Sequence, residues 1–207
     1  LPGMAAGALT DILFAPEADD MYPHGHSTWV EVGRIAELLE GKSRPGHFRG
    51  VATVVAKLFN IVKPHVAVFG QKDAQQAAVI RRMAADLNFG VEIVVAPTVR
   101  EPDGLAMSSR NVYLSPAERV QAPALRRSLD AALRDIAAGE RDCATIGRRM
   151  REIISREPSA SIDYISLADA DTLEELPTLA RGSRALVSLA VRIGKTRLID
   201  NDIVIVD

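Results

Sequence analysis

With 207 residues, 47% of them hydrophobic and 25% charged, the chain has the composition of an ordinary globular protein that can bury a core in one or two domains. Basic residues number 25 and acidic residues 27, and the resulting formal net charge of −2 argues against a nucleic-acid partner, which would select a basic surface. No apolar run approaches the roughly 20 residues that cross a bilayer, so we expect no membrane partner.

The single cysteine and the first residues bear on the cellular compartment. Cys143 has no second cysteine to pair with, which fits a reducing compartment. Residues 1–6 (LPGMAA) lack the basic stretch that opens a secretory signal. We therefore expect a cytoplasmic protein.

The first half of the chain alternates apolar segments with turns. Residues 11–16 (DILFAP) predict a short buried strand ended by proline, and residues 28–32 (TWVEV) alternate like an edge strand. Residues 41–50 (GKSRPGHFRG) indicate a basic loop. The next predicted elements are a helix at 51–62, a fully buried strand at 66–69, a helix at 74–87 and a strand at 91–95. Alternating helices and strands with short connections predict a parallel sheet covered by helices.

Beyond Pro97 the pattern becomes that of a small α+β domain. Residues 100–104 (REPDG) predict a turn-rich hinge, and residues 116–138 predict a long helix with Ser115 as its N-cap. The remaining predicted elements are a helix at 143–155 and short strands at 163–167, 185–191, 196–198 and 203–206. Placing the boundary near Thr98 gives two domains, 1–98 and 99–207.

The turn after the strand at 66–69 is a candidate phosphate site. Gly70 lies where a strand ends and a helix begins, at the edge where open α/β sheets bind ligands. Free N–H groups at a helix start attract phosphate, and Lys72 adds a positive charge there. Asp73 is suited to a ribose hydroxyl, and Gln76 follows one turn later. Taken alone, this turn is equally compatible with a solvated lysine and an aspartate that caps the helix.

A second polar segment follows the hinge, at residues 107–110 (MSSR). Its two hydroxyls and the Arg110 guanidinium predict a mobile clamp for an anion. Taken alone, it is more simply interpreted as a polar loop that enters the next domain.

Together and in this order, the two segments resemble the pantothenate synthetase family. The resemblance extends over residues 12–206, and it is carried by YPHG at 22–25, SRPGHFRG at 43–50, FGQKDAQQ at 69–76, PTVR at 97–100, DGLAMSSRN at 103–111, YL at 113–114 and RLIDN at 197–201. It implies an α/β fold, with a Rossmann-like parallel-sheet nucleotide domain truncated at its N-terminus and a smaller α+β lid domain. It also implies a homodimeric ligase that uses ATP and Mg²⁺ to join pantoate to β-alanine through a pantoyl adenylate, releasing pyrophosphate and AMP.

The resemblance assigns roles to individual residues. The residues it implies for ATP are Gly70, Gln71, Lys72, Asp73, Val99, Met107, Ser108, Ser109 and Arg110. Within that set, the implied catalytic residues are Lys72, Ser108, Ser109 and Arg110, which would stabilise charge on the phosphates. Gln76 would bind pantoate. The sequence does not identify a ligand for the metal.

One part of the family pattern has no counterpart in the 207 residues. The family's His-x-Gly-His loop and one of its pantoate-binding glutamines are absent, and the spacing of His24 and His26 does not replace that loop. We therefore expect this chain to be inactive by itself. Two alternatives stay open: another nucleotidyltransferase of the His-x-Gly-His superfamily, and a non-catalytic remnant that folds or dimerises.

Histidines and the cysteine outside these motifs have weaker patterns. His47, in the basic glycine loop, is a possible site residue, and a structural contact at a domain or subunit boundary is equally compatible. His24 and His26 lack an obvious third metal ligand and are interpreted as loop residues. Cys143 is predicted to pack as a small apolar residue.

Overall fold

The structure is a computed structural model that describes residues 10–207. Residues 1–9, which include the stretch considered above as a secretory signal, lie outside the described residues. The α-helices are α2 (Ala18–Met21), α3 (Glu40–Ser43), α4 (His47–Val62), α5 (Ala74–Asp86), α6 (Pro116–Gln121), α7 (Ala124–Ala137) and α8 (Cys143–Ile154). The 3-10 helices are η1 (Arg34–Ala36), η2 (Gln71–Asp73) and η3 (Ser109–Tyr113). The strands are β1 (Val66–Gly70), β2 (Glu92–Ala96), β3 (Ala160–Asp169), β4 (Arg184–Ile193) and β5 (Thr196–Ile205).

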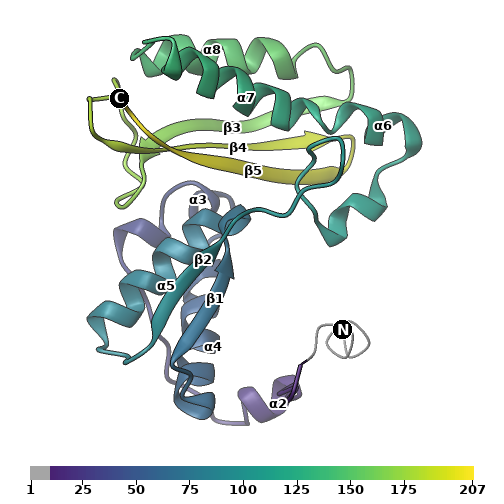
Figure 1. Ribbon diagram of the computed structural model, residues 1–207. Coiled ribbons are helices and arrows are strands. Elements are labelled where there is room, and N and C mark those ends of the chain that lie inside the picture. The colour runs from purple at the N-terminus through teal and green to yellow at the C-terminus, as the bar shows by residue number, and fades with distance from the viewer. Residues whose placement is uncertain (1–9) are drawn as a thin grey trace.

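The first half of the described chain is a parallel strand pair with helices packed against it (Figure 1). β1 and β2 pair in parallel, from Val66 opposite Glu92 to Gly70 opposite Ala96. Helix α5 forms the crossover between them, because parallel strands cannot be joined by a tight turn. The core of this half includes Phe48, Ala52 and Phe59 of α4 and Val79, Ile80 and Met83 of α5. The parallel α/β arrangement expected from the sequence is confirmed.

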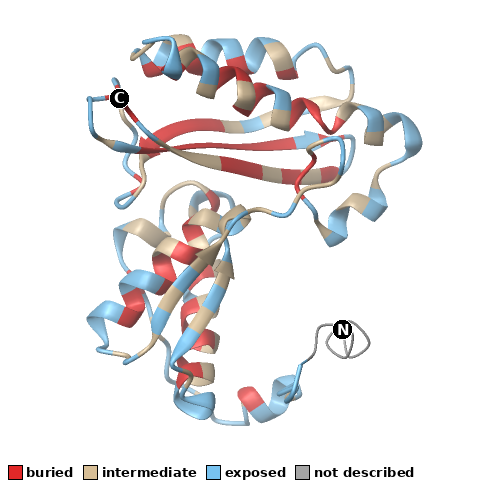
Figure 2. Ribbon diagram, viewed as in Figure 1, coloured by how far each residue is buried: buried red, intermediate tan, exposed pale blue. Residues whose placement is uncertain are grey.

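The second half is an antiparallel sheet in the order β3-β4-β5. Helices α7 and α8 lie across one face of this sheet, and their buried sides turn toward it (Figures 1 and 2). The buried residues between these layers include Leu129 and Ile136 of α7, Ile146 and Met150 of α8, and Val187 and Leu189 of β4. This confirms that an antiparallel α+β part follows the parallel one.

The other face of the three-stranded sheet faces a cavity. Successive residues of a strand point to opposite faces, so Val187 and Leu189 pack on the helices while their neighbours turn away from them. The residues on the cavity side are Tyr164 of β3, Leu186 and Ser188 of β4, and Arg197, Ile199 and Asn201 of β5. The second half therefore supplies both its own core and one wall of the site.

The predictions of two strands near the start of the chain are wrong. Residues 11–16 form no strand, no other described segment pairs with them, and Ile12 is 85% exposed. Residues 28–32 run as a loop along α4, because the Val30 N–H donates to Thr53 Oγ1 at 2.9 Å and not to a neighbouring strand.

The segment predicted as a loop at 41–50 is largely helical. Helix α3 extends to Ser43, and α4 begins at His47, earlier than the predicted start at residue 51. The strand predicted at 66–69 is β1, but it is not fully buried. Val66 and Val68 are 47% and 64% exposed, because the core contacts Ala67 and Phe69 on the opposite face.

The long helix predicted at 116–138 is broken into α6 and α7. Pro123 lies at the break, since it has no N–H to donate and would clash with the preceding helical turn. Ser115 caps α6 as predicted, through a capping box with Glu118.

The two strands predicted at 196–198 and 203–206 are a single strand, β5. The polar residues in its middle suggested an interruption, but each has a partner. Asp200 binds Arg100, Asn201 binds Gln71 and Asp202 binds Arg126. Hydrogen bonding makes it possible to bury Asp200 and Asn201 at the centre of the strand.

The two hydrophobic clusters are separate along the sequence. One involves residues from Val30 to Ile93, and the other involves residues from Leu105 to Val206. The domain boundary near Thr98 stays a prediction. Among residues 10–207, no helix combines the length and apolar character needed to cross a membrane.

Candidate nucleotide and substrate site

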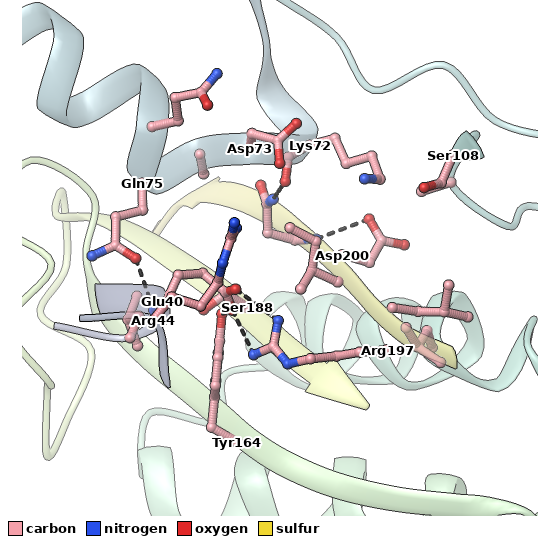
Figure 3. A pocket seen from close by; sticks show the side chains of 18 of the residues that line it. Glu40, Arg44, Lys72, Asp73, Gln75, Ser108, Tyr164, Ser188, Arg197 and Asp200 are labelled. Atoms are coloured by element: carbon pink, nitrogen blue, oxygen red, sulfur yellow. Dashed lines mark hydrogen bonds and ion pairs between the residues drawn. The ribbon is translucent and has the colours of Figure 1, made fainter. Parts of the chain in front are cut away.

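A cavity of about 220 Å³ lies between the carboxyl end of β1 and the polar face of the β3–β5 sheet (Figure 3). The turn after β1 and the first turn of α5 form one wall, and the sheet forms the opposite wall. Further lining comes from α3 and the loop after it, the start of α4, the segment entering η3 and Leu125 of α7. Ligands of open parallel sheets bind at the carboxyl ends of the strands, so this cavity is the candidate site.

The turn after β1 brings an uncompensated cation to the cavity. Lys72 and Asp73 line it, and neither forms an ion pair with another residue of 10–207. Asp73 occupies the N-cap position of α5, but its side chain makes no capping hydrogen bond there. A Cβ atom at Gly70 would meet nothing within 4 Å, which leaves space for a ligand beside the backbone.

Asn201 of β5 fixes this turn from across the cavity. Its Nδ2 donates to the Lys72 carbonyl at 2.9 Å and to the Gln71 carbonyl at 3.1 Å. Its Oδ1 accepts from Gln71 Nε2 at 2.8 Å. Asn201 is 4% exposed, so these bonds are shielded from water. The second half of the chain therefore sets the backbone position of Lys72.

The segment at residues 107–110 lies on the same side of the cavity as Lys72 (Figure 3). Ser108 is the N-cap of η3, and its Oγ accepts from the Arg110 N–H at 3.2 Å. Ser108 and Arg110 line the cavity, and Arg110 forms no ion pair within the described part of the chain. Met107 is half-exposed and is tied to Val99 only through a backbone hydrogen bond of 2.9 Å.

The cavity brings together part of the predicted residue set. The predicted residues that line it are His47, Lys72, Asp73, Gln76, Ser108 and Arg110. The predicted residues that do not line it are Gly70, Gln71, Val99, Met107 and Ser109, of which Gln71, Met107 and Ser109 are immediate sequence neighbours of lining residues. The role of each residue stays a prediction.

The base of the 107–110 segment is anchored to the sheet. Arg100 donates to both carboxylate oxygens of Asp200, at 2.7 and 3.0 Å, and to the Gly104 carbonyl at 3.1 Å. Asp200 is 1% exposed, and Leu105 and Ala106 are buried in the core. Any rearrangement of the Ser-Ser-Arg segment must therefore take place beyond Ala106.

A partly buried ionic cluster joins the two halves at the other end of the cavity. The Arg197 guanidinium donates to both oxygens of Glu40 at 2.7 and 2.9 Å, and also to Asp163 at 2.6 Å. The Tyr164 hydroxyl donates to Glu40 at 2.9 Å. Hydrogen bonding to Glu40 raises the pKa of Arg197, and burial, followed by the nearby Glu40 charge, raises the pKa of Tyr164. The cluster is thus held as a neutral tyrosine with fixed ion pairs.

Gln75 connects this cluster to α5. Its Oε1 accepts from the Glu40 N–H at 2.9 Å, and its Nε2 donates to the carbonyls of Ile35 and Leu38 at 2.9 and 2.7 Å. Gln75 is 5% exposed. The neighbouring Gln76 lines the cavity and has no such structural bonds within the described residues, so its amide is available to a ligand.

Arg44 and His47 form a pair at the start of α4. Arg44 Nη1 lies 3.0 Å from His47 Nε2, and both residues line the cavity. Burial lowers the pKa of His47, and the Arg44 charge lowers it further. The imidazole is therefore neutral and can accept a hydrogen bond from the guanidinium.

Sequence reasoning missed several residues that line the cavity. Glu40, Tyr164 and Ser188 come from three separate elements, and no local motif marks them. Ser188 is 5% exposed, and its hydroxyl has no partner within the described residues. The RLIDN stretch at 197–201 supported the resemblance, but it contains none of these three residues.

The remaining candidates have structural surroundings. His26 packs edge-on against Tyr22 and Trp29, and residues 10–207 contain no group of His, Cys, Asp or Glu side chains that could hold a metal. Cys143 is 7% exposed within the core, which confirms its predicted packing. Burial raises the pKa of its thiol to about 11.

The fold and the cavity define an α/β protein of the nucleotidyltransferase-like class, with an antiparallel second domain that contributes to the site. A family model described as Pantoate-beta-alanine ligase matches residues 3–203. The chain belongs to the pantoate–β-alanine ligase family.

Individual relatives agree with this assignment. The chain is 62% identical over 191 residues to the pantothenate synthetase of Roseiflexus sp. (strain RS-1), covering 92% of this chain and 68% of the relative. The crystal structure of pantothenate synthetase from Thermus thermophilus has a TM-score of 0.90 and 46% identity, over 97% of this chain and 72% of that one. The Francisella tularensis pantoate-beta-alanine ligase, solved with Beta-gamma ATP and Beta-alanine, has a TM-score of 0.73 and 33% identity, over 97% of this chain and 67% of that one.

Proposed function

We propose that this protein condenses pantoate with β-alanine at the expense of ATP, through a pantoyl-adenylate intermediate. Membership of the pantoate–β-alanine ligase family supports the reaction. The observation that carries the proposal is the cavity itself, which is lined both by Lys72, Arg110 and Ser108 and by the Gln76 amide, which has no partner among the described residues. A triphosphate and a small hydroxy acid need these two kinds of group side by side.

The first half-reaction requires positioned positive charge. A carboxylate oxygen of pantoate attacks the α-phosphorus of ATP, the bond to the bridging oxygen breaks, and pyrophosphate leaves with that electron pair. Negative charge grows on the phosphate oxygens, so Lys72, Arg110, Ser108 and Ser109 are proposed to stabilise it as hydrogen-bond donors and cations. No nucleophile from the protein is needed. The remaining nucleotide contacts are proposed at Gly70, Gln71, Asp73, Val99 and Met107.

The second half-reaction forms the amide. The amine of β-alanine attacks the carbonyl carbon of the adenylate, the bond from that carbon to the phosphate oxygen breaks, and AMP leaves. The nitrogen releases a proton to solvent. We propose that Gln76 holds the pantoyl group during both steps, because an amide can donate to its carboxyl oxygen and accept from its hydroxyls.

We propose that Mg²⁺ enters with the nucleotide. Glu40 and Asp200 are committed to arginines, which leaves Asp73 as the unpaired carboxylate among the described cavity residues. One carboxylate is enough for a magnesium ion that phosphate oxygens and water also coordinate. Mg²⁺ bound in this way would neutralise phosphate charge.

We also propose how the chain is organised and where it works. Residues 1–98 would carry the nucleotide and pantoate, and residues 99–207 would form a lid. We propose a homodimer because the family resemblance implies one. A cytoplasmic location is supported by the free thiol of Cys143.

The test is pantoate-dependent exchange of labelled pyrophosphate into ATP by the full-length gene product, without β-alanine. Adding β-alanine should then release AMP and form an amide product. Pyrophosphate exchange that does not depend on pantoate, or a stable nucleotide-linked product, would assign the protein to another nucleotidyltransferase reaction. Absence of any exchange by the folded protein would favour a non-catalytic role.

A further inference from the structure

Arg44 and His47 line the cavity, but the proposed catalytic steps give neither of them a role. Arg44 forms no ion pair with any residue of 10–207, and its only side-chain partner there is His47. Both residues line the cavity, as does Glu40, which precedes them in α3.

The short loop that carries this pair is held in place. The Arg44 N–H donates to the Glu40 carbonyl at 2.9 Å, and the His47 N–H donates to the Arg44 carbonyl at 3.1 Å. Gly46, at φ +78°, makes the turn that a residue with a side chain would resist. Because the Glu40 side chain is bound by Arg197 and Tyr164, the backbone under Arg44 is anchored to the far wall of the cavity.

The cations around the cavity fall into two groups. Arg197 is neutralised by Glu40 and Asp163, whereas Arg44, Lys72 and Arg110 have no acidic partner in the described part of the chain. Lys72 and Arg110 are the groups proposed for the triphosphate. Arg44 lies at the other side of the cavity, beside Glu40, as Figure 3 shows. An unpaired guanidinium there is suited to a second, separate anion.

The reaction supplies two carboxylates, and only one of them should bind a strong cation. The carboxylate of pantoate is the nucleophile, and a bidentate contact with a guanidinium would lower its nucleophilicity. The carboxylate of β-alanine does not react, and it must be held so that the amine, two carbons away, reaches the adenylate. A guanidinium offers two parallel N–H donors that match such a carboxylate.

We propose that Arg44, oriented by its hydrogen bond to His47, is the carboxylate subsite for β-alanine. This inference rests on the proposed function. His47 acts as a positioning residue, because its neutral Nε2 accepts from Arg44 and fixes the fork. Arg44 lies at an exposed position, which suits a substrate that enters after the adenylate has formed.

The experiment separates the two half-reactions in the full-length gene product. Arg44→Ala should leave pantoate-dependent pyrophosphate exchange within about twofold of the unaltered protein, because neither ATP nor pantoate uses this subsite. It should lower kcat/KM for β-alanine about 30-fold or more, as expected when a charged hydrogen-bonded contact is lost. Arg44→Lys should recover part of this loss, because it restores the charge without the fork.

Arg49→Ala is the matched control. Arg49 lies on the same helix as His47 but over the Trp29 ring, at 5.3 Å from its centroid, and outside the cavity lining. It should change neither rate.

A second measurement tests recognition of the carboxylate itself. The unaltered protein should strongly prefer β-alanine to β-alaninamide, and Arg44→Ala should lose most of that preference. His47→Phe should reduce the same preference while leaving pyrophosphate exchange in place. Equal loss of exchange and of β-alanine use in Arg44→Ala, or an unchanged preference, would overturn the subsite. Absence of exchange in the unaltered protein would overturn the proposed function, and the subsite with it.

Discussion

Two segments bring to the cavity the groups that we propose to bind phosphate, and the two segments are held very differently. The turn at Lys72 is fixed by Asn201 through the carbonyls of Gln71 and Lys72, in a setting shielded from water. Within the described part of the chain, Ser108 and Arg110 make only local hydrogen bonds, such as that from the Arg110 N–H to Ser108 Oγ. We therefore propose that the first segment is in place before a ligand binds, and that the second gains partners from the ligand.

This difference suggests a division of work. A fixed cation costs no reorganisation when charge develops on phosphate, which is the condition for strong electrostatic stabilisation. A segment without fixed partners can open to admit ATP and then close over an adenylate that water would destroy. The firm base at Arg100 and Asp200 limits such motion to the residues that follow Ala106.

Lys72→Ala breaks the fixed side of the site and should have the largest effect. Losing one positioned cation should lower pantoate-dependent pyrophosphate exchange by about 10²-fold or more. The fold should persist, because Lys72 has no ion pair within residues 10–207. Lys42→Ala, on the exposed surface of α3, is the control for loss of a lysine. Near-normal exchange by a folded Lys72→Ala protein would contradict the assignment.

Asn201→Ala tests whether the hydrogen bonds from Asn201 to the carbonyls of Gln71 and Lys72 matter as much as the Lys72 cation that they position. Without the donors to the two carbonyls, the turn should drift, and exchange should fall roughly 30-fold. Gln71→Ala removes only the side-chain bond and should cost much less. Comparing KM for ATP with kcat separates positioning from folding, since a purely structural defect would lower the active fraction alone. Equal exchange rates for Asn201→Ala and Gln71→Ala would show that the Asn201 hydrogen bonds do not set the position of Lys72.

Gln76→Ala tests selectivity between the two substrates of the first step. Gln76 lines the cavity without structural bonds, so KM for pantoate should rise about 10-fold while KM for ATP stays nearly constant. Gln76→Glu should weaken pantoate binding further, because the new carboxylate would repel the carboxylate of pantoate. A defect in ATP use as large as that in pantoate use would argue that the residue serves the nucleotide.

The parallel half of the fold could be predicted because its signals are local. The apolar period of α4 and α5 and the strands β1 and β2 follow from residue spacing. Residues 11–16 and 28–32 were predicted wrongly, since the same apolar patterns form a strand only where another strand accepts their hydrogen bonds. β5 was split in the prediction, because nothing near Asp200 indicates that Arg100 will neutralise it.

The same limit applies to the site. The glycine, lysine and serine–arginine motifs each lie within a few residues, so the sequence identifies them directly. Glu40, Tyr164 and Arg197 meet only after folding, across sequence separations of 124 and 157 residues from Glu40. Asn201 likewise acts on Lys72 from 129 residues away. Residues proposed to bind ATP and pantoate could be predicted, whereas Arg44 and the residues that hold the site in place could not.

Hydrogen exchange of the full-length gene product tests the contrast between the two segments most directly. Without nucleotide, amides of residues 108–110 should exchange quickly, because the hydrogen bonds that Ser108 and Arg110 make within the described residues are local and exposed. A non-hydrolysable ATP analogue should then slow exchange strongly across residues 108–110, as Ser108 and Arg110 acquire phosphate partners. Unchanged exchange across residues 108–110 on saturation with the analogue would contradict a segment that the ligand orders.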